Sequence, residues 1–441
     1  MKIRDSILKF LGVLIFNFTV WHCSENPIQS DLSHSTIYLD TLTIREISGT
    51  NYWVAPNLGS NEKLYLGTKN GLNVPVSFIE IETPSPNYWN YYYDSTITID
   101  SLHFKLYTND SLLGLKEVLL PFLYFKSGFH FDESENTYLD FSGFTISDWI
   151  EIGSPRIKIN TVKDTVFTSD DSIMTISDNY LSTELVWDIM SIIDNLTFSK
   201  NNNNNTPLIS TGERTFSIYN PQIDYFEAFS EEATTGEKDP KVLMYYRRSV
   251  ITGDSTTIDT TSATIYSSGD LSIIEPNVMA LDSTKLGLSN GMGLRSVMNI
   301  SFLSSSLPAG SIIRSADLIL PIDTTLSSPS YTVILDPIET DSSAIDSVVV
   351  YEKDPYNGIG YPYRVSSDSS NWRSTSANLG WGHDLFIVSI KNILQNIALE
   401  NETILGFKVV ANEKNDPFES IWFDLHHSSV HPRVEIIYVA D

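Results

Sequence analysis

Two segments within residues 285–320 alternate apolar and polar positions with a period of two, as a strand with one buried face does. The first segment covers residues 297–302, and the second covers residues 312–320. Between them the alternation stops at a short connection with Pro308 and Gly310, residues that supply the fixed or positive φ angles of turns. A strand, a tight connection and a second strand predict antiparallel pairing, so we expect an all-β protein.

The first half of the chain repeats this plan. Four of its segments match four segments of the second half in the same order: 63–67 with 285–289, 76–81 with 296–302, 97–106 with 312–320, and 239–246 with 431–438. Ordered matches of this kind indicate a tandem duplication. Under that duplication Leu64 corresponds to Leu286, and Val242 corresponds to Val434.

Each half also contains one segment with apolar residues at a helical period, residues 181–196 and residues 385–399. We therefore predict one short capping helix in each half. Residues 249–262 are rich in Ser, Thr, Asp and Gly, which favours a linker. The predicted organisation is a first β module at residues 36–248 and a second β module at residues 263–441.

The second half resembles a known family in four places: residues 285–288, 294–302, 307–320 and 431–438. Their order, an xLxxG segment, a turn, an RS-led strand, an LPxG connection and a final PxLxIxY strand, resembles the DNRLRE-type secreted β-sandwich modules of bacterial surface proteins. The first half is looser, because it has no Arg at the RS position and no LPxG connection. The resemblance implies jelly-roll-like sandwiches on an exported protein, similar to carbohydrate-binding modules and often found beside polysaccharide-active domains.

The N-terminus has the pattern of an export signal. Basic residues precede a mostly apolar run at residues 10–21, which is too short for a membrane span and is typical of a signal-peptide core. Cys23, the only cysteine, follows this run, so no intramolecular disulfide forms. We predict a lipoprotein-type signal peptide at residues 1–23 with Cys23 as the lipidated residue, and a polar tether at residues 24–35.

Two alternatives for this segment stay open: an ordinary cleaved secretion signal and an uncleaved anchor. Trp21 and His22 stand where the lipoprotein pattern has small residues. In each case the expected location is outside the cytoplasm, as an outer-membrane lipoprotein or another cell-envelope or cell-surface protein.

The formal net charge of −27 argues against nucleic acids and anionic membrane surfaces as partners, so membrane contact is expected only through the lipid anchor. The acidic residues are candidates for a structural calcium site. The candidate ligands are Asp132, Glu133 and Glu135, or Asp254 and Asp259. No loop carries a fixed calcium-ligand spacing, and a solvated acidic surface is the alternative. We expect no other cofactor.

Aromatic side chains in loops are candidates for stacking on sugar rings, whose C–H faces pack on π-faces. The candidate residues are Trp89, Tyr91, Tyr92, Tyr93, Trp372 and Trp381. The alternative is that these rings pack in the core or anchor loops. Residues 426–431 contain three histidines, but strand alternation would point neighbouring side chains to opposite faces, which disfavours a transition-metal site.

Common catalytic motifs are absent from the sequence: there is no GxSxG, HExxH, phosphate-binding loop or CxxC pair. We therefore predict a non-catalytic surface protein that binds polysaccharide or cell-surface glycan. The first alternative is a structural or adhesive protein whose sandwiches act as spacers or protein-docking units. A polysaccharide-active enzyme is the second, because the separation of two catalytic carboxylates is not visible in a sequence.

Overall fold

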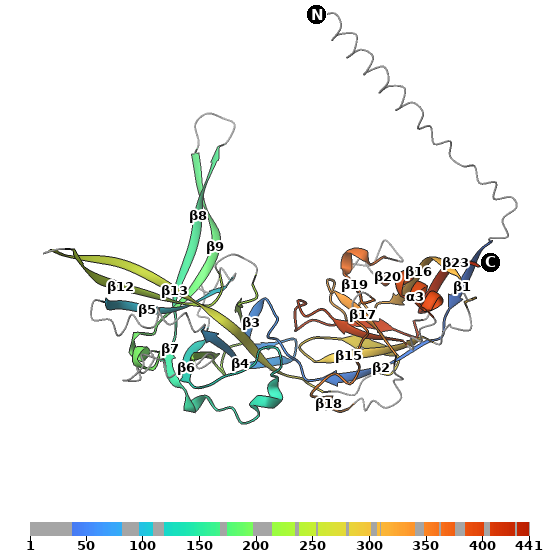
Figure 1. The fold of residues 1–441 in the computed structure, drawn as a ribbon, viewed down its shortest axis with the longest axis horizontal. Helices are drawn as coiled ribbons and strands as arrows, with labels where there is room; N and C mark the ends of the chain where they lie inside the picture. Colours follow the sequence, from blue (N-terminus) through green and yellow to red (C-terminus); the bar gives the residue numbers. More distant parts are fainter. Residues whose placement is uncertain are drawn as a thin grey trace, which may run out of the picture.

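The computed structural model describes residues 38–440 apart from 82–96, 109–118, 168–173, 197–213, 234–237, 253–254, 279–281, 301–306, 309, 340–347, 361–362, 375–383, 401–405 and 428–429. The protein is all-β, as expected: its described strands form four sheets, and its helices are short (Figure 1). No helix of the described residues is long and apolar enough to cross a membrane.

Module 1 is built on an 11-stranded sheet with the order β7-β6-β10-β4-β13-β12-β5-β9-β8, in which β3 pairs with β4 and with β11. Its strands are β3 (Lys63–Lys69), β4 (Leu72–Ile81), β5 (Ile97–Thr108), β6 (Phe122–Ser127), β7 (Ile150–Gly153), β8 (Arg156–Phe167), β9 (Met174–Asp188), β10 (Arg214–Tyr219), β11 (Tyr225–Phe229), β12 (Lys241–Thr252) and β13 (Ser255–Glu275). The sheet encloses a core in which Phe104 stacks on Phe216 with ring centroids 4.5 Å apart.

Module 2 contains the other three sheets, with the orders β1-β23-β16-β20, β18-β2-β15-β21-β17-β19 and β14-β22. Its strands are β1 (Tyr38–Ile44), β2 (Ile47–Val54), β14 (Lys285–Leu288), β15 (Leu294–Ile300), β16 (Ile312–Pro321), β17 (Val333–Ile338), β18 (Val350–Tyr351), β19 (Val365–Ser367), β20 (Leu385–Ser389), β21 (Gly406–Ala411), β22 (Ile421–Asp424) and β23 (Arg433–Ala440). One apolar cluster, which includes Leu318, Val409 and Val434, fills the space between these sheets.

The two modules pair equivalent strands in the same way. In module 1, β3 pairs with β11, β4 with β10, and β5 with β12 and β9. In module 2, β14 pairs with β22, β15 with β21, and β16 with β23 and β20. Even an irregularity recurs, because the register shifts once in the β5–β12 pair and once in the β16–β23 pair.

Matching hydrogen bonds fix the alignment of the repeats. Ser77 donates to the Tyr65 carbonyl at 2.5 Å, and Ser296 donates to the Gly287 carbonyl at 2.8 Å. Leu64 therefore occupies the position of Leu286, as the duplication predicts. Val242 lies opposite Phe104 and Val434 lies opposite Leu318, which makes these two valines equivalent as well.

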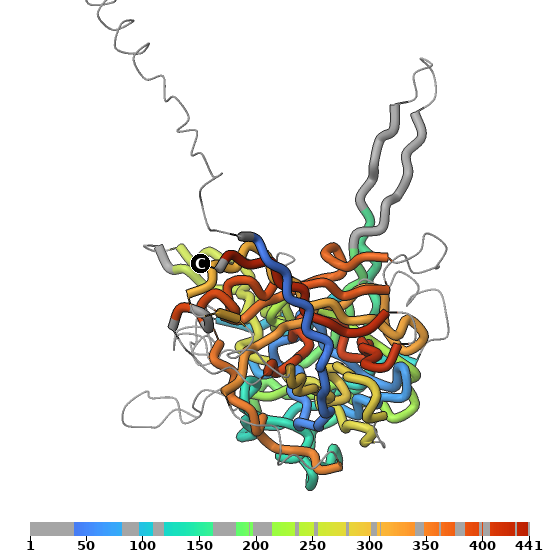
Figure 2. Tube along the Cα trace, turned by 90° about the vertical axis from the view of Figure 1, so that its right-hand side faces the viewer, coloured from blue at the N-terminus to red at the C-terminus, as the bar shows by residue number. Residues whose placement is uncertain are grey.

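The first repeat begins with β1 and β2, and the second begins with the long strand β13. These initial strands pair with strands of the other repeat. β13 pairs with β12 and β4 of module 1, and β1 and β2 pair with β23 and β15 of module 2 (Figures 1 and 2). The registers agree, since Ile265 lies opposite Val242 and Ile44 lies opposite Val434. β13 thus belongs to module 1 although it directly precedes the other strands of module 2 in the sequence. In the same way, β1 and β2 belong to module 2 although they precede the strands of module 1.

This exchange corrects the predicted boundaries. Residues 38–54 belong to module 2 and not to a module at 36–248, while β13 belongs to module 1 and not to a module at 263–441. The predicted linker at 249–262 is wrong, because its described residues pair in the β12–β13 hairpin. Residues 255–262 are all exposed, so both faces of this part of β13 can carry Ser and Thr. These residues gave the segment the composition of a linker.

The predicted helices are mostly strand in the first repeat. Residues 181–188 end β9, and only a turn of 3-10 helix (Met190–Ile192) and α2 (Ile193–Leu196) follow. Leu185 and Ile189 are four residues apart and both buried, which fits either a strand or a helix. In the second repeat residues 385–389 form β20, and α3 (Lys391–Glu400) is the capping helix, with Ile393 and Leu394 in the core.

Candidate binding cleft and acidic cluster

Phe418 joins the two modules. It follows β21 of module 2 and packs into a cluster of module 1 residues that includes Tyr65, with the two ring centroids 5.2 Å apart. Polar contacts surround this cluster: Lys69 pairs with Asp416 at 2.7 Å, and Asn70 donates to the Phe418 carbonyl at 3.0 Å. The apolar contact buries Phe418 almost completely, so the two modules share a packed joint.

A polar cleft of about 770 Å³ lies beside this joint, between the loops of module 1 and the β15–β21–β17 face of module 2. Its lining residues are Pro56, Asn57, Ser60, Asn61, Ser134, Glu232, Ser289, Asn290, Gly293, Leu294, Arg295, Ile334, Arg364, Lys408, Val410, Ala411, Asn412, Glu413 and Lys414. Most of these side chains carry amide, hydroxyl or charged groups. The volume falls within the range of small-ligand sites.

Amide side chains hold the walls of the cleft. Asn61 of module 1 donates to the Glu413 carbonyl of module 2 at 3.1 Å, and Asn290 donates to the Asn412 carbonyl at 2.6 Å. Asn57 donates to the carbonyl of Glu133 at 2.8 Å. These bonds run from side chain to main chain, so they fix the loops that form the rim.

The basic side chains of the cleft are oriented by carboxylates behind them. Arg295 and Lys408 both bind Asp354, and Arg364 pairs with Asp336 at 3.3 Å. Burial disfavours the charged form of Asp354, but Arg295 and Lys408 outweigh burial and hold the pKa of Asp354 below its usual value. The side chains of Arg295 and Arg364 remain 34% and 46% exposed, so both can also contact a ligand.

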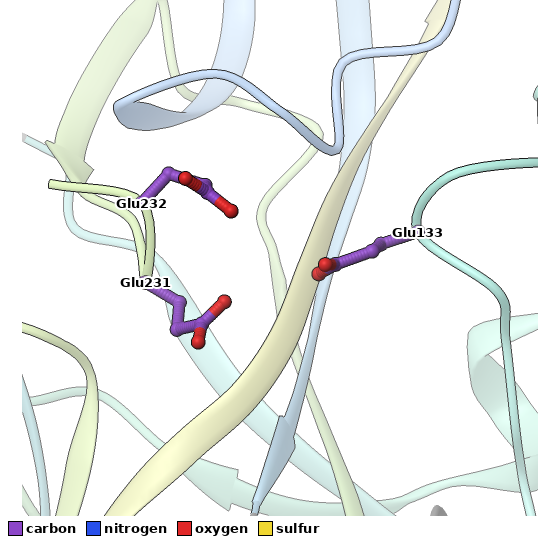
Figure 3. A group of neighbouring side chains, drawn as sticks. All are labelled: Glu133, Glu231 and Glu232. Atoms are coloured by element: carbon purple, nitrogen blue, oxygen red, sulfur yellow. The ribbon is translucent and has the colours of Figure 1, made fainter.

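Three glutamates form a cluster at the module 1 end of the cleft. Carboxylate oxygens of Glu133, Glu231 and Glu232 all lie within 4.8 Å of one another, and Glu232 lines the cleft (Figure 3). Glu133 comes from the loop after β6, and the other two come from the turn after β11. Figure 3 shows the Glu133 side chain extending toward β13, opposite Glu231 and Glu232.

Local packing fixes both loops of the acidic cluster (Glu133, Glu231 and Glu232). Phe131 packs on Phe78 with ring centroids 5.9 Å apart and thereby positions Glu133. Ser230 donates to the Asn61 carbonyl at 2.6 Å and positions the turn with Glu231. The carboxylates are therefore held close to one another by contacts that lie outside the cluster.

Asp270 of β13 lies against this cluster and is 1% exposed. Its Oδ2 accepts from the Glu231 N–H at 2.6 Å, and its own N–H donates to Glu133 Oε2 at 3.0 Å. Its other oxygen, Oδ1, is buried without a hydrogen-bond partner among the described residues. A buried carboxylate oxygen without a partner is costly, and such groups ordinarily pair with a donor or a cation.

The crowded carboxylates disfavour each other's charged forms. Burial and the charges of Glu133 and Glu232 raise the pKa of Glu231 to about 7. Burial also raises the pKa of Asp270 well above its usual value, although the Glu231 N–H opposes this effect. No Lys or Arg forms a salt bridge with these four residues in the described parts of the chain, and Lys414, a basic residue that lines the cleft, pairs with Glu62 at 2.9 Å.

Of the four predicted calcium ligands that the structure describes, it brings one, Glu133, into this cluster. Asp132 accepts from Ser134, Glu135 pairs with Lys353 at 3.2 Å, and Asp259 lies on the exposed end of β13. Asp254 lies outside the described residues. Sequence reasoning missed Glu231, Glu232 and Asp270; the adjacent glutamates were the only signal, and a pair of acidic residues is common on a surface.

The predicted ligand-binding role of Trp372 is wrong. This ring is 1% exposed and packs in the module 2 core, with its centroid 6.3 Å from that of Phe386. The short 3-10 helix capped by Asp368 turns the chain so that Trp372 points inward although its neighbours are polar. The other predicted aromatic residues, Trp89, Tyr91, Tyr92, Tyr93 and Trp381, and the predicted lipidation residue Cys23, lie outside the described residues.

Comparisons with protein-family models, curated proteins and solved structures found no match to this chain. The resemblance to DNRLRE-type modules therefore rests on the sequence motifs alone.

Proposed function

We propose that this protein is an exported, envelope-anchored surface protein that binds a glycan in the cleft between its two modules without transforming it. The observation that supports this proposal best is the polar cleft of about 770 Å³, bounded by both modules beside a packed joint. The resemblance to secreted sandwich modules favours the same class of ligand. The loop at residues 88–93 stays a candidate for additional stacking on sugar rings.

The chemistry of the cleft suits a sugar chain. Sugar hydroxyls need donors and acceptors at fixed positions, and groups fixed before binding lose little entropy when the ligand arrives. Arg295 and Arg364 are held by carboxylates but remain partly exposed. Their guanidinium groups offer several donors, which suit hydroxyl groups and, still better, the carboxylates of acidic sugars.

A structural or adhesive role is the second candidate, and the long hairpins favour it. The β8–β9 and β12–β13 hairpins extend away from the module 1 core (Figure 1). The β12–β13 hairpin carries exposed apolar side chains, among them Ile258 at 65% exposure and Val250 at 39%. Extended hairpins of this kind suit docking to another protein. If the protein has this role, the cleft would bind no ligand.

A glycan array with a soluble fragment starting at Leu32 tests the proposed binding function. Lys414→Ala provides the matching variant, because Lys414 lines the cleft, is 64% exposed and pairs only with a partly exposed carboxylate. We expect affinity for the selected glycan to fall about 3–10-fold, corresponding to about 0.7–1.4 kcal/mol. Lys353→Ala is the control, since Lys353 is also exposed and paired but does not line the cleft. Absence of any glycan hit, or equal loss in both variants, would contradict the proposal.

Fractionation of cells tests the proposed anchor at Cys23. Replacing Cys23 by Ser should release the protein from the membrane fraction, because lipid chains on this residue would supply the hydrophobic attachment. Intact-mass measurement of the wild-type protein should show the lipid on Cys23 at the mature N-terminus. An unmodified cysteine, or cleavage far from residue 23, would rule out the anchor and leave the cleft proposal untouched.

A further inference from the structure

The carboxylates of Glu133, Glu231, Glu232 and Asp270 place up to four negative charges around one small region of module 1. The three glutamates bring oxygens within 4.8 Å of one another, and Asp270 bonds to the main chain or side chain of two of them. The pairing that usually offsets such repulsion is missing here, because no salt bridge to these residues is present among the described side chains. We propose that the acidic cluster binds a calcium ion that links the loop after β6, the turn after β11 and strand β13.

The buried oxygen of Asp270 is an observation independent of the cluster itself. Asp270 Oδ1 is buried without a hydrogen-bond partner, while Oδ2 of the same carboxylate is 2.6 Å from the Glu231 N–H. Asp270 is therefore held against Glu133 and Glu231 with unused acceptor capacity. A cation coordinated by the neighbouring glutamates would offset its charge, either directly or through a bound water molecule.

Backbone geometry beside Asp270 favours this arrangement. A Cβ atom at Gly269 would lie 2.7 Å from Glu133 Oε2, so glycine at this position leaves room for the Glu133 carboxylate beside β13. The Asp270 N–H then holds Oε2 in place, which leaves Oε1 as the oxygen that can turn toward Glu231 and Glu232. The glycine and the bond together position Glu133 before any ion arrives.

The donor set selects the type of ion. All ligand atoms are carboxylate oxygens, which suit hard cations, and the cluster contains no histidine or cysteine. Calcium accepts six to eight oxygens in flexible geometry, so carboxylates from separate loops and several waters can complete its shell. Magnesium demands a tighter octahedron, which three long glutamate side chains from two loops satisfy less readily.

Module 2 provides an internal comparison. The β3–β11 and β14–β22 registers place Glu231 and Glu232 at the positions of His426 and His427, and the long-strand registers place Asp270 at the position of Gly49. Three of the four carboxylates, those of Glu231, Glu232 and Asp270, therefore have no acidic counterpart at these positions of module 2. We place the proposed site in module 1, and one calcium ion is expected there.

Calcium titration of the metal-free protein tests the site. The soluble fragment from Leu32, stripped with EDTA, is titrated with CaCl₂ by calorimetry and compared with the double variant Glu231→Gln/Glu232→Gln. We expect one site in the wild-type fragment and at least a tenfold weaker affinity in the double variant. Glu135→Gln is the matched control, because Glu135 lies on the same loop as Glu133 but pairs with Lys353 instead.

Thermal melting separates loss of binding from loss of folding. At a calcium concentration 100-fold above Kd, the wild-type melting temperature should rise by roughly 5–10 °C. In EDTA the double variant should melt at or above the wild-type temperature, since two like charges are removed, and calcium should not shift it. No wild-type binding at millimolar calcium, or equal binding in wild type and double variant, would overturn the site. The calcium titration contains no glycan, so the absence of a glycan-array hit would contradict the proposed function and leave the calcium site untouched.

Discussion

Module 1 and module 2 pair their strands equivalently, yet they differ at the same edge of the fold. In module 1 the turn after β11 carries Glu231 and Glu232 beside Asp270, whereas module 2 has histidines and Gly49 at the equivalent positions. The residues that preserve the pairing are buried, among them Leu64 and Leu286. The difference shows that the shared strand pairing depends on buried apolar residues, while turns and adjacent strand positions of each module can carry separate chemistry.

Core packing should give the largest effect in each module. Trp372→Ala in module 2 and Trp187→Ala in module 1 remove rings that are each 1% exposed. We expect each change to lower the free energy of unfolding by about 4 kcal/mol, because it leaves a large cavity. Chemical denaturation measures the loss. If Trp372→Ala instead weakened glycan binding at unchanged stability, Trp372 would not be a core residue and the comparison would fail at this position.

The joint should have the next largest effect. Phe418→Ala removes the ring that packs between Tyr65 and Tyr225, with centroid distances of 5.2 and 5.4 Å. We expect a loss of about 3 kcal/mol and a separation of the melting transitions of the two modules. Differential scanning calorimetry detects the separation. A single unchanged transition would mean that Phe418 does not couple the modules.

The ion-pair group behind the cleft predicts an acid-sensitive contribution to the stability of module 2. Asp354 binds Arg295 and Lys408, and its folded-state pKa is lowered below the usual value. A lowered pKa means that the stabilisation is complete above about pH 4 and is lost as the pH falls through the folded-state pKa.

Replacing Asp354 by Asn should therefore cost about 2 kcal/mol at pH 7 and much less near pH 2. Urea denaturation across this pH range provides the measurement, and Glu435→Gln, which alters a half-exposed pair, is the control. A cost that stays constant with pH would show that the charge of Asp354 contributes nothing.

The smallest expected effect concerns the equivalent hydrogen bonds of the long strands. Ser272 of β13 accepts from the Tyr65 N–H at 3.0 Å, and Asn51 of β2 accepts from the Gly287 N–H at 2.8 Å. Ser272→Ala should cost about 1 kcal/mol, and Asn51→Ala about 2 kcal/mol because Asn51 also donates to the Lys285 carbonyl. Denaturation midpoints measure both. A reversed order would mean that the second hydrogen bond of Asn51, to the Lys285 carbonyl, does not add to stability.

Much of the fold was readable from the sequence because it rests on local patterns. The alternation at 297–302 and 312–320 predicted strands, and described parts of both segments lie in β15 and β16. The repeated segments predicted the equivalence of Leu64 with Leu286, which the pairing confirms. The exchange of the initial strands could not be predicted from the sequence. β1, β2 and β13 could pair in the same register with strands of their own repeat or with strands of the other repeat.

The site was less readable than the fold. Glu133 was a candidate on composition, but the cluster depends on contacts over long distances in sequence, such as the bond from the Asp270 N–H to Glu133. Trp372 failed as a surface candidate because one capped turn decides which way a ring points, and polar neighbours do not reveal it. The cleft exists only where the two modules meet, so neither half of the sequence displays it alone.

Titration of the Phe418→Ala fragment with the array-selected glycan tests the central claim, that the ligand site is formed by the two modules together. The joint lies beside the cleft, while the acidic cluster lies within module 1. In calcium-containing buffer, we predict at least tenfold weaker glycan affinity than the wild-type fragment has, with both modules still folded. Unchanged glycan affinity in a variant with separated melting transitions would contradict the claim, because a single module would then be sufficient for binding.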